Sequence, residues 1–158
     1  MQAAGVIGRY AIGGAVGATF YVEAFATEDL DIFVDLPPAD TSLVSLGPIY
    51  DYLRARGYHG EREHIRVEGW PVQFLVPNNT LQRDALDEAI EINVEGVRTL
   101  VMQAEHLAAI ALQTGRAKDY ARIALMIQQY GLDSSKLDSI LKNHGLADKW
   151  QNAKSRFS

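Results

Sequence analysis

Residues 10–36 read YAIGGAVGATFYVEAFATEDLDIFVDL and decide the fold. Residues 10–12 predict a first strand, which the pair Gly13-Gly14 ends. The apolar residues of 15–25 recur at helical spacing, so we expect a short helix buried against a sheet. Residues 30–34 alternate with a period of two, which is typical of a strand. The stretch therefore predicts two strands of one sheet with a glycine turn and a helix between them.

The remaining residues predict further strands and a helical end. Residues 1–9 suit the last turns of a short helix, 43–53 a helix with Gly57 after it, 61–76 a β-hairpin, and 81–89 a short helix. A strand pair over 90–101 turns at Glu95-Gly96. From residue 103 the periodicity is helical, with two helices meeting at Gly115 and a third capped by Ser135. We expect an α+β fold: a small mixed β-sheet flanked by helices in 1–102, and a C-terminal helical part in 103–158, packed as one compact unit.

Composition excludes several classes of protein. The 158 residues are 47% hydrophobic and carry a formal net charge of −5, which indicates one folded domain and disfavours nonspecific binding to duplex nucleic acid. The chain has no Cys, so disulfides, thiolate metal sites and thiol nucleophiles are excluded. The apolar stretch 11–22 is too short to span a membrane, and no signal peptide is evident. These features predict a cytoplasmic protein without a membrane partner.

Asp29 and Asp31 are the first candidates for chemistry. Side chains alternate across a strand, so the two carboxylates face the same side with Cα atoms about 6.6–7 Å apart. Such a pair suits a divalent cation, Mg²⁺ or Mn²⁺, bound together with a phosphate. The turn at Gly13-Gly14 lets the backbone approach a phosphate. Together these residues indicate phosphoryl transfer, although a glycine turn or an Asp-x-Asp edge strand alone is usually structural.

Other phosphate and catalytic motifs fail on spacing. The chain has no P-loop and no Gly-x-Ser-x-Gly elbow. A dinucleotide fingerprint is rejected because Ile12 stands where its first glycine should be. The four histidines have no zinc-ligand spacing, so they are interpreted as surface or core residues: His59, His64, His106 and His144.

Residues 10–36 resemble the nucleotidyltransferase superfamily of polymerase-β-like enzymes, whose signature is a glycine turn, a helix and an Asp-x-Asp strand. Residues 104–123, AEHLAAIALQTGRAKDYARI, resemble the helices of its AbiEii-type and minimal nucleotidyltransferase branch. The resemblance implies transfer of a nucleoside monophosphate from an NTP to an acceptor hydroxyl. It also implies a macromolecular acceptor, an RNA end or a protein, and a partner of the toxin–antitoxin kind.

The resemblance assigns roles by position. Asp29 and Asp31 would be catalytic and bind the metal, and Gly13 and Gly14 would hold the triphosphate. Lys118 would contact the phosphates, supported by Arg116 and Asp119. From the residues alone, Lys118 could equally lie on a solvated helix face, and Arg116 with Asp119 could form a surface pair of little energetic weight.

Gln73 departs from the superfamily pattern. It occupies the position where a later strand usually supplies a third carboxylate, and a neutral amide cannot act as a general base. Two functions therefore remain open, a metal-dependent enzyme and a catalytically impaired nucleotide-binding or interaction protein. Glu68 in the predicted turn is an alternative carboxylate. For an RNA acceptor, four arginines would be close together if the second helix and the hairpin share an edge: Arg54, Arg56, Arg62 and Arg66.

Overall fold

The computed structural model describes residues 1–23, 27, 29–38, 45–61 and 64–157. Within these residues a mixed sheet of seven strands has the order β3-β4-β5-β2-β1-β7-β6. β2 is antiparallel to β1 and parallel to β5, and β1 is parallel to β7. The predicted α+β class is confirmed. The strands are β1 (Tyr10–Ile12), β2 (Leu30–Val34), β3 (Gly60–Glu61), β4 (His64–Val67), β5 (Trp70–Leu75), β6 (Ile90–Val94) and β7 (Val97–Val101).

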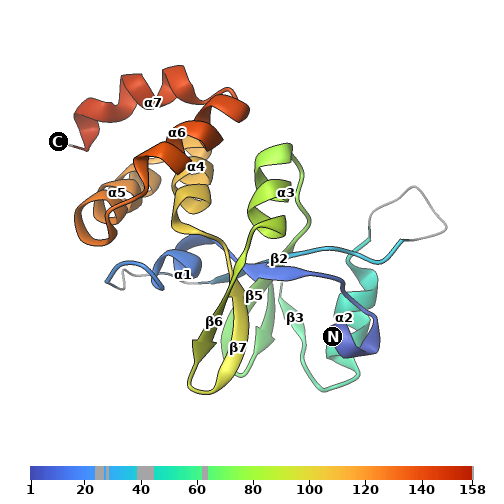
Figure 1. The fold of residues 1–158 in the computed structure, drawn as a ribbon. Helices are drawn as coiled ribbons and strands as arrows, with labels where there is room; N and C mark the ends of the chain where they lie inside the picture. Colours follow the sequence, from blue (N-terminus) through green and yellow to red (C-terminus); the bar gives the residue numbers. More distant parts are fainter. Residues whose placement is uncertain (24–26, 28, 39–44, 62–63, 158) are drawn as a thin grey trace.

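The helices occupy both faces of the sheet. Figure 1 shows α4 to α7 together on the side of α1 and α3, away from α2. No helix of the described residues is long and apolar enough to cross a bilayer. The helices are α1 (Gly14–Ala18), α2 (Gly47–Arg54), α3 (Thr80–Asp87), α4 (Ala104–Thr114), α5 (Ala117–Leu125), α6 (Ser134–Asn143) and α7 (Ala147–Ala153), with the 3₁₀ turns η1 (Gln2–Ala4) and η3 (Lys154–Arg156) and the π-helical turn η2 (Met126–Tyr130).

Two apolar cores lie on opposite faces of the sheet. On one face, α2 packs Ile49 and Leu53 against Ile65, Val72 and Phe74 of the strands. On the other face, the larger core joins α1, α3 and the C-terminal helices to the strands. Because side chains alternate along a strand, the residues of β2 and β5 next to those in the α2 core point toward the C-terminal helices. That second face carries the candidate site.

α4 is the central helix of the larger core. Eight of its eleven residues are buried, and it packs against α1, α3, α5 and α6. Gly115 ends it in the left-handed conformation with φ of 73°, which favours glycine, and α5 begins two residues later. The predicted junction of two helices at Gly115 is confirmed. This sharp turn brings the first turn of α5 back to the rim of the cleft described below.

Several predicted boundaries differ from the structure. The helix expected over 15–25 ends at Ala18, where the β-branched Thr19 donates its hydroxyl to the Val16 carbonyl at 2.7 Å, and residues 24–26 lie outside the described part. The helix expected from residue 43 begins at Gly47, and residues 43 and 44 also lie outside it. The cap predicted at Ser135 is wrong. Asp133 caps α6 instead, because its carboxylate accepts from the Lys136 backbone N–H at 3.0 Å.

Candidate functional site

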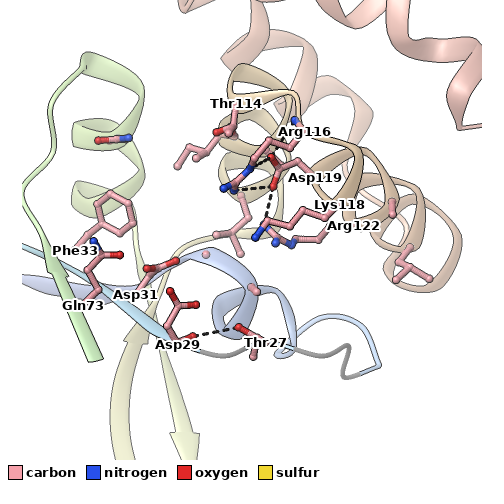
Figure 2. Close-up of a pocket in the computed structure, with 18 residues that line it drawn as sticks. Thr27, Asp29, Asp31, Phe33, Gln73, Thr114, Arg116, Lys118, Asp119 and Arg122 are labelled. Carbon is pink, nitrogen blue, oxygen red and sulfur yellow. Dashed lines mark hydrogen bonds and ion pairs between the residues drawn. The ribbon is translucent and has the colours of Figure 1, made fainter. Parts of the chain in front are cut away.

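A cleft of about 680 Å³ lies between the sheet and the helices α4 and α5. Its walls come from segments far apart in the sequence, and Figure 2 shows them facing each other. Because the strands supply one wall and α5 the other, the packing of α4 on the sheet determines how far apart they stand. The lining residues are Gly14, Ala15, Thr27, Asp29, Asp31, Phe33, Gln73, Gln82, Leu107, Ile110, Ala111, Thr114, Arg116, Lys118, Asp119, Ala121, Arg122 and Leu125.

The glycine turn is packed directly against the Asp31 carboxylate. The Gly13 N–H donates to the Asp31 carbonyl at 3.0 Å. Gly14 has φ of 58°, and a Cβ built there would lie 2.0 Å from Asp31 Oδ2. Only glycine therefore fits this position without displacing the carboxylate. Gly14 lines the cleft, whereas Gly13 is buried beside it, where a Cβ would meet the Phe33 ring at 2.8 Å.

Asp29 and Asp31 both line the cleft, on one side as Figure 2 shows. Burial, followed by the charge of Asp29, raises the pKa of the Asp31 carboxyl, against the opposing effects of Arg122, His64 and Arg116. The described residues contain no group of three or more His, Asp or Glu that could hold a metal ion. Two adjacent oxygen donors nevertheless fit a hard cation such as Mg²⁺, which takes its other ligands from phosphates and water.

The raised pKa of Asp31 predicts that Asp31→Asn stabilises the metal-free protein at neutral pH. A carboxyl whose pKa is higher in the folded state binds its proton more tightly there, so the fold loses stability as pH rises through that pKa. The amide of Asp31→Asn does not ionise, so the variant avoids the loss of stability that ionisation of Asp31 causes. We expect a higher Tm at pH 7, by about 2–4 °C for each kcal/mol relieved, and little gain at pH 3. Thermal melts without divalent cations measure it, with the exposed Asp51→Asn as control. An equal gain at both pH values would contradict the electrostatic origin.

The opposite wall is organised by Asp119. Its side chain is 1% exposed and accepts from the Arg116 Nε at 2.7 Å, while Arg122 Nη1 lies 3.5 Å from its other oxygen. Arg116 caps α5, and its backbone N–H also donates to Asp119. Burial acts to raise the pKa of Asp119, but the hydrogen bonds and charge of Arg116, with the charge of Arg122, hold it below its ordinary value. Asp119 thus stays ionised and fixes two guanidinium groups at the cleft.

Lys118 and Arg122 complete a cationic wall on α5. Figure 2 shows them with Arg116 across the cleft from Asp29 and Asp31. Lys118 is exposed, whereas the Arg122 side chain is 12% exposed, and burial lowers the pKa of its guanidinium. One wall has two carboxylates, and the other has three cations and the carboxylate of Asp119, so the second wall keeps a net positive charge. This arrangement suits a polyphosphate that carries a divalent cation.

Gln73 lies directly beside Asp31. The two residues are partners in the parallel register of β2 and β5, and Gln73 also lines the cleft. Glu68 does not line the cleft, and it accepts a hydrogen bond from the Tyr58 hydroxyl at 2.6 Å. The side chain nearest along the sheet to Asp31 is therefore a neutral amide, and Glu68 is engaged elsewhere.

The structure adds two residues that the sequence did not single out. Arg122 follows Lys118 by four residues, and this spacing on one helix face could have indicated it. His64 Nε2 lies 3.3 Å from Asp29 Oδ2. No sequence pattern links these two residues, because the contact depends on the order of strands in the sheet.

Three of the four arginines predicted to lie near an RNA acceptor have local contacts. Arg54 pairs with Asp51, Arg56 stacks over the Tyr52 ring, and Arg66 donates to the Gly69 carbonyl. Arg62 lies outside the described residues. α2, which ends at Arg54, packs on the face of the sheet opposite the cleft.

Comparison with known proteins supports the fold. No family model matches the chain, and no curated protein matches it. Among solved structures, the chain is similar to the crystal structure of an antigenic nucleotidyltransferase-like protein from Paracoccidioides brasiliensis. The TM-score is 0.55 at 18% identity, and the match covers 94% of this chain and 83% of that chain. At this identity the likeness shows the fold alone, so the AbiEii-type branch stays a prediction.

Proposed function

Since the chain has a nucleotidyltransferase-like fold, we propose that it is a nucleotidyltransferase that moves a nucleoside monophosphate from an NTP to an acceptor hydroxyl. The observation that carries the proposal is the cleft in which Gly14 packs on Asp31, and Asp29 and Asp31 face the cations of α5. The opposed charges match a nucleotide whose phosphates are partly neutralised by a cation.

In this proposal each wall has one task. Asp29 and Asp31 hold Mg²⁺ or Mn²⁺, which when bound neutralises and orients the phosphates of the NTP. Lys118 and Arg122 bind the phosphate oxygens from the opposite side. Arg116 and Asp119 hold α5 in the orientation that presents those cations. The apolar residues of α4 that line the cleft offer a dry surface to the rest of the nucleotide: Leu107, Ile110 and Ala111.

Gln73 supports a second candidate, nucleotide binding without transfer. An amide beside Asp31 cannot accept the proton of an attacking hydroxyl, and it adds no negative charge for a second cation. If the protein is an enzyme, the acceptor hydroxyl must therefore lose its proton to another group, such as water. A catalytically impaired protein of the same fold needs no such group.

Nucleotide binding is expected to depend on the divalent cation. We expect Mg²⁺ or Mn²⁺ to raise the affinity for ATP or GTP, because the cation removes the repulsion between the phosphates and the two aspartates. Asp29→Asn and Asp31→Asn should each reduce this metal-dependent gain by about tenfold or more. Calorimetry with and without the cation measures it, and the exposed Asp51→Asn is the matched control. Equal affinities for all variants, with and without metal, would refute the site.

A transfer assay separates the two candidates. Radiolabelled NTP is offered with RNA ends and with proteins as acceptors, and label transfer that requires Asp29 and Asp31 supports the enzyme. Binding without transfer supports the second candidate. An RNA or protein acceptor, a toxin–antitoxin partner and a cytoplasmic location remain predictions of the sequence.

A further inference from the structure

We propose that His64 is a positioning residue that holds the Asp29 carboxylate in place for the divalent cation. The inference rests on the proposed function, because it concerns how that metal site is built. It assigns a role to a histidine whose sequence context suggests only a surface or core residue.

The contact between His64 and Asp29 has a defined direction. Nε2 of His64 lies 3.3 Å from Oδ2 of Asp29, and the two side chains are 29% and 39% exposed. A carboxylate oxygen can only accept, so the ring nitrogen is the donor. The hydrogen bond occupies Oδ2 and leaves Oδ1 available for a cation.

The backbone pairing of the strands positions His64 near Asp29. Ile65 of β4 pairs with Val72 of β5 in antiparallel register, so His64 lies opposite Gln73. Gln73 in turn pairs with Asp31 of β2. A row of three side chains, His64, Gln73 and Asp31, therefore crosses three strands on the face of the cleft. Its position depends on the strand ladder rather than on a loop.

Asp29 needs such a partner more than Asp31 does. Asp31 lies within β2 and packs against Gly14, whereas Asp29 precedes the first residue of that strand. Asp29 also has a hydrogen bond through its backbone carbonyl, which accepts from the Thr27 hydroxyl at 3.2 Å. That contact leaves the rotation of the carboxylate unrestrained. Partners that hold a metal-binding carboxylate commonly change metal affinity by about 10–100-fold.

Manganese binding to the full chain tests the role of His64 directly. Electron paramagnetic resonance of free Mn²⁺ gives the affinity without any nucleotide or activity, at pH 8, where ordinary imidazoles are neutral. His64→Ala should bind Mn²⁺ about 10–100-fold more weakly than the wild type. His64→Gln should stay within about threefold of wild type, because its amide N–H can donate from a similar place. His59→Ala is the control, since His59 is exposed and its side chain makes no hydrogen bond or ion pair with the described residues.

Each outcome decides the proposal. Weak binding by His64→Ala with rescue by His64→Gln supports it, provided that thermal melts show both variants folded. Wild-type affinity in His64→Ala would overturn it, and so would equal weakening in the Ala and Gln variants, which indicates a loss of packing rather than of a donor. If Asp29→Asn and Asp31→Asn bind Mn²⁺ like the wild type, the proposed function fails as well. If they do not, failure at His64 leaves it intact.

Discussion

Gly14→Ala is expected to weaken metal-dependent nucleotide binding by about 100-fold, because displacement of a site group by about 1 Å has an effect of that size. The added Cβ would lie 2.0 Å from Asp31 Oδ2, so the carboxylate must move out of its position in the cleft. The left-handed backbone at Gly14 adds a strain of about 1–2 kcal/mol. Calorimetry with ATP and Mg²⁺ measures the binding, and a thermal melt measures the fold.

Gly5→Ala is the matched control for this substitution. Gly5 has a similar φ of 66°, but nothing lies within 4 Å of a Cβ built there. Gly5→Ala should therefore have the backbone strain of a left-handed alanine but no clash of its Cβ with another residue, and its nucleotide affinity should be unchanged. If Gly14→Ala binds nucleotide as the wild type does, the glycine turn is not part of the site.

Asp119→Ala is expected to lower the free energy of unfolding by about 3 kcal/mol, near the lower end for breaking a buried ion pair. The carboxylate is 1% exposed, and its loss leaves the largely buried Arg122 without this counter-charge. We expect a loss near the lower end of that range because the Arg116 side chain is 58% exposed, so water can solvate it when Asp119 is removed. Urea denaturation measures the change, and Asp138→Ala, exposed on α6, is the control.

The stability change at Asp119 should depend on pH. The pKa of Asp119 is lowered in the folded state, so its stabilising effect is complete above the ordinary aspartate value and is lost as pH falls through the folded pKa. Wild type and Asp119→Ala should therefore converge in strong acid. A loss below about 1 kcal/mol at pH 7 would mean that the pair behaves as an ordinary surface salt bridge.

Local features of the fold could be predicted from the sequence. The strand, glycine turn and second strand of residues 10–34 follow from period and turn chemistry, as does the junction at Gly115. The cap of α6 was misassigned because Asp133 and Ser135 are both good capping residues. The choice depends on a distant contact, since the Asp133 backbone N–H donates to Glu105 Oε1 of α4 at 3.0 Å.

In the candidate site too, local features could be predicted from the sequence, whereas contacts between distant segments could not. That Asp29 and Asp31 share a face follows from strand geometry alone, and both line the cleft. Their position across from Lys118 and Arg116 was implied only by resemblance, because it depends on how α4 packs between the sheet and α5. The contact of His64 with Asp29 required the strand order β4-β5-β2, which a single sequence does not reveal.

The burial of α4 has a consequence for how this protein can diverge. Leu107 and Ala111 line the cleft and also belong to the larger core, so a substitution that reshapes the α4 side of the cleft also alters the stability of the fold. Lys118 and Ala121 of α5 line the same cleft but are exposed, and surface changes cost little. We expect descendants of this sequence to acquire new substrate preferences mainly through α5, while α4 changes slowly.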